Sequence, residues 1–326
     1  MNHGKFIISL DFELMWGVRD KKNMSSYGNE ILGVHTVIPK LLQLFNVYNI
    51  NGTFSIVGFL FFNSKEELLD HIPTFVPNYS DPNLSPYNGY IHNLEDDVVN
   101  DVYHFAPNLI DEIKKSPGQE IGTHTFSHYY CLEANQTIEE FRADITNAII
   151  AANKFNTKLT SLIFPRNQYN KEYIKVCNEL GIICYRGNES SWLYSAKNGK
   201  EDTLIRRAFR LIDAYINISG HNCSTQSLNQ KLPINIPSSR FLRPYSKKLR
   251  FIEKFRFLRI KRGMTYAAKN NLTYHLWWHP HNFGVNQEEN FKFLEKVLNH
   301  YQFLNSKYNF KSYTMSGLVN NLFEKK

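Results

Sequence analysis

The chain has 326 residues, of which 42% are hydrophobic, and it carries a formal net charge of +8. This length and apolar content suffice for one large core, so we expect residues 1–326 to form a single catalytic-size domain. The apolar runs, such as residues 6–10, are far shorter than the roughly 20 residues of a membrane-spanning helix. The positive charge favours an anionic partner, but nothing in the chain resembles a nucleic-acid-binding module, so we expect no nucleic acid partner.

Cysteine usage and the N-terminus indicate a cytoplasmic protein. The four cysteines are scattered without a CxxC pair, and a chain of this length needs no disulfides to stabilise it. The N-terminal run MNHGKFIISLDFE ends its short apolar stretch at acidic residues, unlike a secretory signal. We therefore expect reduced thiols and a cytoplasmic or membrane-peripheral location.

Apolar periodicity predicts alternating strands and helices along most of the chain. Residues 6–10 form a predicted buried strand that ends at acidic side chains, and a helix is predicted over about 29–48. Thr137 and Glu140 form a capping box that starts the clearest helix. The other expected strands begin near Gly52 and span 120–123, 161–164, 182–185 and 272–278, and the other expected helices span 107–115, 171–180 and 287–304, with a short one after Ser316. Strands separated by helices predict an α/β fold with a mainly parallel sheet or barrel.

Two segments depart from this alternation. Residues 63–104 form a polar stretch with four prolines, which predicts an insertion or lid. Residues 240–262 hold ten Lys or Arg against one acid, Glu253, with apolar residues between them. This basic segment fits a surface that contacts anionic lipid or a carrier diphosphate, and it equally fits an amphipathic outer helix with a solvated basic face.

The HTFSH motif places His124 and His128 four residues apart, so a helical turn would bring both imidazoles to one face, able to share a metal ion. A catalytic metal needs a third ligand, and Asp11 and Glu13 lie two residues apart on a strand and point to the same face. One carboxylate can bind the ion while the other accepts a proton. Taken alone, each pair also fits solvated side chains.

Two further groups follow predicted strands. Arg166, in FPRNQYN, fits either an arginine that orients a catalytic base or a plain surface arginine. His279, in LWWHPHNFG, fits either an acid that protonates a leaving amine or a structural histidine among aromatic residues. Active sites of parallel α/β folds form at the carboxyl ends of the strands, so we expect these groups to meet the acids and the histidine pair there.

Taken together and in this order, SLDFELMWG, HTFSH, FPRNQ and WWHPHNFG resemble the motifs of the polysaccharide deacetylase family, over residues 6 to about 284. The resemblance implies a distorted (β/α) barrel of about seven parallel strands. It also implies metal-dependent hydrolysis of an N-acetyl or similar N-acyl group on a sugar. The family's Asp-and-Trp motif has no clear counterpart, although Asp213 or Trp192 could stand in for part of it.

The resemblance carries five roles to this chain: Asp11 is similar to the general base, His124 and His128 to the metal-binding histidines, Arg166 to the base-orienting arginine and His279 to the general acid. Glu13 is then assigned to the metal. The Asp-Phe-Glu spacing differs from the adjacent aspartates usual in the family, so the reverse assignment of the two acids stays open. The expected ion is Zn, with Co, Ni or Mn as alternatives.

The expected substrate is an N-acylated sugar, free or linked to a nucleotide or a lipid, as in surface-polysaccharide assembly. Backbone N–H groups near Asn167 and Gln168 are expected to stabilise the oxyanion. The side chains expected at the sugar site are Trp16, Trp277, Trp278 and His281. Two alternatives remain open, a metal hydrolase acting on a small non-sugar amide and a catalytically silent protein that binds a sugar or a lipid carrier.

Overall fold

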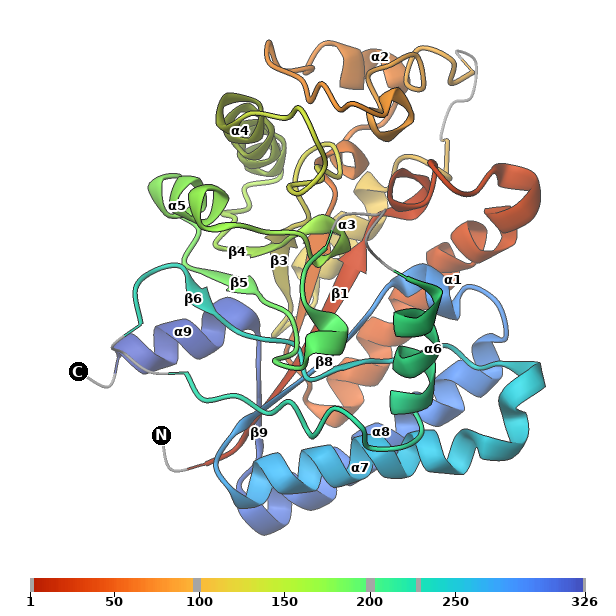
Figure 1. The fold of residues 1–326 in the computed structure, drawn as a ribbon, viewed down its shortest axis with the longest axis vertical. Coiled ribbons are helices and arrows are strands. Elements are labelled where there is room, and N and C mark those ends of the chain that lie inside the picture. The colour runs from red at the N-terminus through yellow and green to blue at the C-terminus, as the bar shows by residue number, and fades with distance from the viewer. Residues whose placement is uncertain (1–2, 96–100, 198–202, 227–229, 325–326) are drawn as a thin grey trace.

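The computed structural model describes residues 3–95, 101–197, 203–226 and 230–324. In this part of the chain nine strands form one sheet in the order β6-β5-β4-β3-β2-β1-β8-β7, with β9 pairing with β1 (Figure 1). The pairings between these strands are parallel. The strands are β1 (Lys5–Phe12), β2 (Gly52–Ile56), β3 (Glu120–Thr123), β4 (Ser161–Ile163), β5 (Cys184–Arg186), β6 (Ile234–Asn235), β7 (Arg240–Phe241), β8 (Thr273–Trp278) and β9 (Lys311–Tyr313).

The short segment between β6 and β7 joins the two edges of this sheet. The Ile236 N–H donates to the Tyr185 carbonyl of β5 at 2.9 Å, and the Ser239 N–H donates to the His275 carbonyl of β8 at 2.8 Å. The sheet therefore curls into the distorted (β/α) barrel that the sequence predicted. The expected barrel of about seven parallel strands is confirmed, and the short strands β6, β7 and β9, of two or three residues each, complete the sheet.

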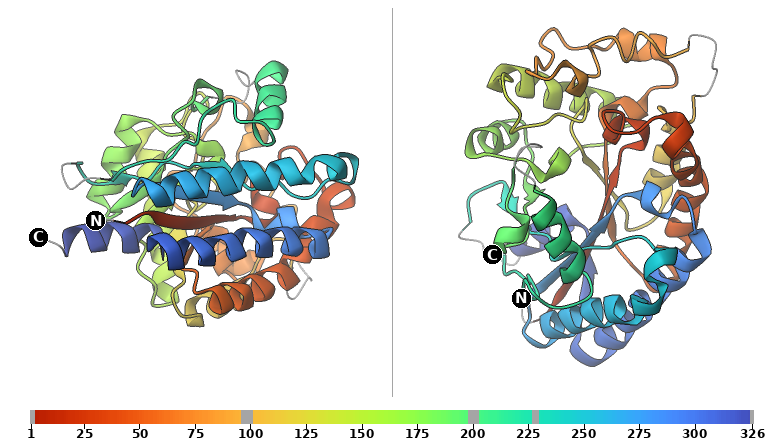
Figure 2. Two further views of the ribbon diagram at one scale, coloured as in Figure 1. Left: turned by 90° about the horizontal axis from the view of Figure 1, so that it is seen from below. Right: turned by 45° about the vertical axis from the view of Figure 1, so that its right-hand side comes forward.

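Helices cover the outside of the barrel, and α7 and α8 lie against each other along one side (Figure 2). The capping box predicted at Thr137 and Glu140 is present at the start of α4. The helices are α1 (Met24–Tyr48), α2 (Lys65–Leu69), α3 (Pro107–Lys115), α4 (Ile138–Lys154), α5 (Lys171–Glu179), α6 (Leu204–Asp213), α7 (Glu253–Lys269), α8 (Gln287–Tyr308) and α9 (Met315–Phe323). None of these described helices is long and apolar enough to cross a membrane.

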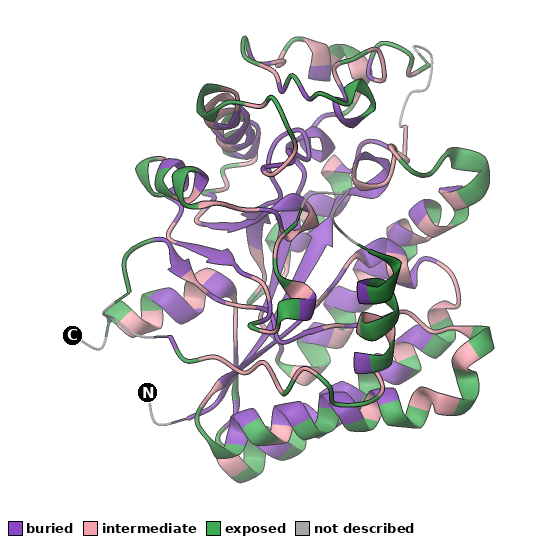
Figure 3. Cartoon of the chain, viewed as in Figure 1, coloured by how far each residue is buried: buried purple, intermediate pink, exposed green. Residues whose placement is uncertain are grey.

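Every residue of β1 is buried, and this strand lies between β2 and β8 in the middle of the sheet (Figure 3). Its register pairs Asp11 with Ser55 of β2 and Leu10 with Trp278 of β8. The carboxyl ends of β1 and β8 therefore lie side by side. This brings Asp11 of β1 and Glu13, directly after β1, next to the histidines that follow β8.

The segment predicted as an insertion, 63–104, contains α2 and a short 3-10 turn at Pro82–Leu84, and its residues 96–100 lie outside the described part. Tyr79 and Leu84 from this segment pack against Tyr130, which directly follows the HTFSH motif. The segment therefore covers the side of the barrel on which that motif lies. Its function as a lid remains a prediction.

Candidate active site

Glu13 and the two histidines of HTFSH form a buried cluster at the carboxyl end of β1. Glu13 Oε2 lies 3.3 Å from His124 Nε2 and 3.1 Å from His128 Nε2. One ligand atom from each of these three residues lies within 4.8 Å of the other two. A Cβ on Gly17 would lie 1.9 Å from Cδ of Glu13, so only glycine at that position leaves room for the Glu13 carboxylate.

The histidines converge through a loop, and the helical turn expected for HTFSH is wrong. Thr125 and His128 have φ values of 66° and 61°, a left-handed conformation that is costly for a β-branched residue such as threonine. The carboxylate of Asp144, on α4, holds this loop by accepting from the Phe126 N–H at 2.6 Å and the Ser127 N–H at 3.0 Å. Asp144 is a positioning residue that the sequence reasoning missed.

The hydrogen bonds of the two histidines leave Nε2 of each ring facing Glu13. His124 Nδ1 lies 2.8 Å from the Ile163 carbonyl, which requires a proton on that nitrogen. His128 Nδ1 lies 3.1 Å from the Tyr130 hydroxyl. Burial lowers the pKa of His128 to about 4, so its imidazole is neutral near pH 7. Two imidazoles oriented in this way, together with one carboxylate, form a donor set that fits Zn²⁺ or a similar divalent ion.

Asp11 is bound by a buried arginine. Arg186 Nη1 and Nη2 donate to Oδ1 and Oδ2 of Asp11, each at 2.7 Å. The guanidinium also donates to Asn167 Oδ1 at 3.0 Å, and its Cζ lies 4.0 Å from the centre of the Trp277 ring. Burial alone would raise the pKa of Asp11, but Arg186, together with two nearby histidines, outweighs burial and lowers this pKa.

The structure thus gives Asp11 a different partner from the expected one. Arg166 is paired with Asp20, and its Cζ lies 4.0 Å from the centre of the Tyr130 ring. The arginine that pairs with Asp11 is instead Arg186, the last residue of β5. Arg186 directly follows a predicted strand, 182–185. A polar side chain in this position was the signal that identified the other site residues, and it could have identified Arg186 as well.

His279 faces both carboxylates. Its Nε2 atom lies 3.7 Å from Asp11 Oδ2 and 3.7 Å from Glu13 Oε1, and 23% of its side chain is exposed. His281 stacks on it at 4.9 Å between ring centres, and burial lowers the pKa of His281 to about 3. The His279 ring is therefore partly accessible to a ligand, whereas His281 is buried behind it.

Two of the tryptophans expected at the sugar site lie in the core. Trp16 is 1% exposed and its Nε1 donates to the His104 carbonyl at 2.7 Å, while Trp278 is fully buried and stacks on Phe283. Both rings pack against other buried aromatic side chains, a role that sequence cannot distinguish from sugar binding. Trp277 lines the pocket beside His279.

The Asn167 and Gln168 N–H groups are also placed differently from the expectation. They donate to the Phe164 carbonyl at 2.9 Å and the Pro165 carbonyl at 3.1 Å, within the turn that follows β4. These intramolecular bonds occupy the groups that were expected to stabilise an oxyanion. Both residues still line the pocket beside His279.

The raised pKa of Asp144, which holds the HTFSH loop, predicts that stability depends on pH. Burial raises its pKa from the ordinary 3.8 to about 6, so the folded state prefers the protonated acid. Protonation of Asp144 therefore stabilises the folded state. This stabilisation is complete below the pKa that Asp144 has in the unfolded chain, and it is lost as pH rises through the pKa of the folded state. Asp144→Asn mimics the protonated acid. Between about pH 4 and about pH 7 the wild type should therefore lose roughly 2 kcal/mol of unfolding free energy relative to this variant, measured by urea denaturation. If the unfolding free energies of wild type and Asp144→Asn change equally with pH, this expectation is wrong.

Residues 27–185 match the model of the family described as polysaccharide deacetylase. The matched region is just under half of the 326 residues, and over it the chain is similar to this family. The matched region includes HTFSH and FPRNQ, whereas Asp11, Glu13 and His279 lie outside it. This similarity supports a carbohydrate deacetylase, a hydrolase.

Solved structures of the deacetylase family and of related enzymes share this fold. A protein from Mycobacterium smegmatis assigned as a polysaccharide deacetylase has a TM-score of 0.61 at 11% identity, with 100% of this chain and 92% of that chain covered. Another so assigned, from Pseudomonas aeruginosa PAO1, has a TM-score of 0.56 at 10% identity, with coverage of 99% and 91%. The allantoinase PuuE has a TM-score of 0.57 at 10% identity, with coverage of 99% and 90%. No curated protein sequence matches the chain.

Proposed function

We propose that this protein is a metal-dependent enzyme that removes an N-acetyl or similar N-acyl group from a sugar or a sugar-containing polysaccharide precursor. The observation that carries the proposal is one buried centre with three parts. These are the Glu13, His124 and His128 donor set, the Asp11 carboxylate bound by Arg186, and the partly exposed His279 ring.

A divalent ion held by Glu13, His124 and His128 would supply Lewis-acid polarisation of the acyl carbonyl and of water. Asp11 is ionised at neutral pH because Arg186 stabilises its charge, so it can accept the proton of the attacking water as general base. His279, 3.7 Å from both carboxylates, then protonates the departing amine. Acetate and a free amino sugar result.

The different partners of Glu13 and Asp11 support different roles for the two acids. Glu13 lies within 3.3 Å of both histidine Nε2 atoms, whereas both oxygens of Asp11 accept from Arg186. A carboxylate held by a guanidinium is oriented and stays charged, as a base must be. This supports Glu13 as the metal ligand and Asp11 as the base.

Metal content tests the donor set. The purified wild type, reconstituted with Zn, Co, Ni or Mn, should bind close to one equivalent of ion, and His124→Ala/His128→Ala should bind almost none, as measured by elemental analysis. The matched control is His71→Ala/His92→Ala, which also removes two imidazoles but lies in the 63–104 segment. If the wild type binds none of the four ions, the hydrolase proposal fails.

Gly17→Ala tests the position of Glu13 without removing a ligand. The added methyl would overlap the Glu13 carboxylate and displace it, so we expect metal affinity to fall roughly 10- to 100-fold by analogy with other disturbed ligands. Gly28→Ala is the control, because its Cβ would meet only the Tyr103 ring at 3.4 Å. Equal metal affinity in both variants would mean that Glu13 is not a ligand.

The reaction itself is tested by acetate release from N-acetylated sugars, free, nucleotide-linked and lipid-linked, by the metal-loaded protein. Release from any of them that disappears in Asp11→Asn supports the proposal. Release only from a small non-sugar amide would support the alternative hydrolase. Sugar binding without any release would support a catalytically silent binding protein.

A further inference from the structure

A strongly basic pocket adjoins the catalytic centre. Its volume is about 360 Å³, and of its nineteen lining residues eight are Lys or Arg and one, Glu189, is acidic. His279 and Trp277 lie on its wall, and so do the arginines of α6. A substrate that enters the pocket therefore meets these cations within reach of the general acid.

Some of this positive charge is neutralised inside the protein. Arg240 is paired with the buried Asp213 at the end of α6, and Arg166 is paired with Asp20. Arg243 is half-buried, and burial lowers its pKa, so a bound anion would relieve the cost of its charge. Lys21 and Arg207 add two exposed cations to the lining.

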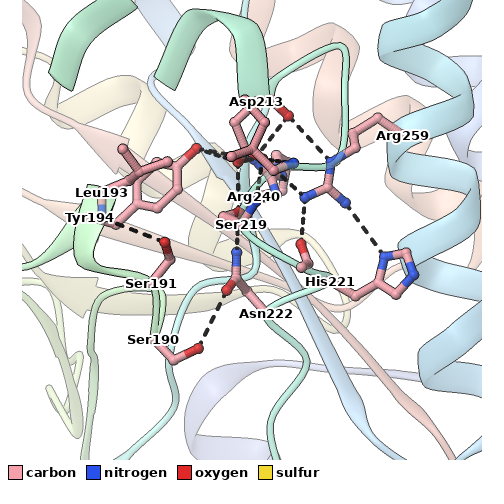
Figure 4. A network of polar contacts seen from close by, with 12 residues as sticks. Ser190, Ser191, Leu193, Tyr194, Asp213, Ser219, His221, Asn222, Arg240 and Arg259 are labelled. Atoms are coloured by element: carbon pink, nitrogen blue, oxygen red, sulfur yellow. Dashed lines mark hydrogen bonds and ion pairs between the residues drawn. The ribbon is translucent and has the colours of Figure 1, made fainter. Parts of the chain in front are cut away.

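A polar network fixes α6 beside the pocket (Figure 4). Asp213 accepts from Arg240 of β7, from the Tyr194 hydroxyl at 2.8 Å and from Ser219 Oγ at 2.7 Å. Arg259 of α7 donates to the Asp213 carbonyl at 3.2 Å. Because the network joins α6 to β7 and α7, the arginines of α6 are held in place on the pocket wall.

The opposite face of α6 is apolar and exposed, the reverse of the usual arrangement in globular proteins. Ile205 is 68% exposed, Phe209 40% and Ile212 44%. Trp192, 64% exposed, lies beside Phe209 with 6.5 Å between ring centres. The left view of Figure 2 shows this helix, in green, projecting from the body of the molecule. These side chains form one apolar patch directly behind the basic pocket.

The neighbouring basic segment, 240–262, continues this surface. Phe255 and Leu258 of α7 line a cavity together with Ile216, which follows α6. Phe251 is 76% exposed and stands next to the exposed Arg250. Large apolar side chains interleaved with exposed cations are complementary to an anionic lipid surface, with the rings in the acyl region and the cations at the headgroups.

We propose that α6 is an interfacial helix whose apolar patch lies in an anionic membrane surface, and that the basic pocket behind it binds the phosphate of a lipid-linked sugar. The second half rests on the proposed deacetylase function. The arrangement places the phosphate among the arginines, the lipid chain toward the patch and the acyl group at His279. Planar guanidinium groups suit phosphate oxygens, and two or more negative charges match the surplus of cations.

Vesicle binding tests the interfacial helix without any need for turnover. The full chain should float with phosphatidylcholine vesicles that contain phosphatidylglycerol. Ile205→Ser/Phe209→Ser/Ile212→Ser should weaken this binding at least roughly 100-fold, because three apolar side chains are lost from the lipid interface. The matched control, Val47→Ser/Ile150→Ser/Phe303→Ser, removes three side chains of similar exposure from other helices and should bind like wild type. All six positions are solvent-exposed, so both variants should melt like wild type.

Charge removal tests the pocket. Arg207→Ala/Arg243→Ala should weaken binding to the anionic vesicles roughly 30-fold and leave binding to pure phosphatidylcholine unchanged. The same variant should lose at least tenfold in affinity for inorganic diphosphate, measured by calorimetry. The Lys158→Ala/Lys296→Ala control removes the same charge elsewhere on the surface and should leave diphosphate binding unchanged.

The outcomes separate this proposal from the catalytic one. Asp11→Asn should bind vesicles like wild type, so a failed deacetylase assay with intact vesicle binding would sink only the catalytic proposal. No flotation of the wild type with anionic vesicles, or equal flotation of the two triple variants, would overturn the interfacial helix. Diphosphate affinity that is unchanged in Arg207→Ala/Arg243→Ala would overturn the phosphate site.

Discussion

Asp11→Asn is expected to lower kcat roughly 10²- to 10⁴-fold, the usual contribution of a general base. The amide preserves the size of the side chain but cannot accept the proton of the attacking water. The Glu13, His124 and His128 donor set is untouched, so metal content should remain that of the wild type. The measurement is the initial rate of acetate release by metal-loaded protein at saturating substrate, together with elemental analysis of the same samples.

Asp20→Asn is the matched control for this variant. It makes the same chemical change in another carboxylate that is paired with an arginine, Arg166. Because Asp20 is bound by Arg166 and not by the catalytic centre, its amide should leave kcat within a few-fold of wild type. A normal kcat in Asp11→Asn would refute the base assignment, and an equal loss in both variants would mean that the loss comes from general destabilisation.

The sequence predicted which types of residue meet at the site but not how they are held. The carboxyl-end rule brought the acids after β1 to the histidine after β8, and the parallel pairing of these strands bears this out. The HTFSH spacing is compatible with a helix, yet the loop adopts left-handed conformations at Thr125 and His128. These are stabilised by Asp144 on α4, a long-range contact that spacing cannot reveal.

The arginines illustrate a second limit. Arg166 and Arg186 both stand at or just after the end of a predicted strand, so position alone does not select between them. The barrel geometry does, because β5 directs Arg186 inward to Asp11 while the turn after β4 directs Arg166 to Asp20. Within the basic segment, likewise, Arg256 and Arg259 are buried in polar contacts, and only part of its charge faces solvent.

Helix α6 was missed although Ile205, Phe209 and Ile212 recur at helical spacing, a signal that was present in the sequence. What the spacing could not show is that this apolar stripe faces solvent and not the core. The buried side of this helix instead carries Arg206 and Asp213. A segment in which charged residues are inside and apolar residues outside departs from the ordinary pattern of a globular domain, and such departures are expected at functional surfaces.

Arg186→Met should destabilise the fold by about 3–5 kcal/mol, because it leaves the buried Asp11 charge without its partner. Both side chains are almost fully enclosed, so solvent cannot replace the guanidinium. Urea denaturation at neutral pH measures the loss. Arg142→Met, which breaks the exposed pair with Glu179, provides the comparison and should unfold at nearly the same urea concentration as wild type.

A double variant separates the charge effect from the packing effect. If an unpaired buried carboxylate is what destabilises Arg186→Met, replacing that carboxylate as well should restore most of the stability, because an apolar pair of similar volume costs little in such a site. Asp11→Leu/Arg186→Met should therefore unfold within about 1 kcal/mol of wild type while having no measurable deacetylase activity. A double variant as unstable as Arg186→Met would mean that Arg186 stabilises the barrel through its contacts with Asn167 and Trp277 and not through the charge of Asp11.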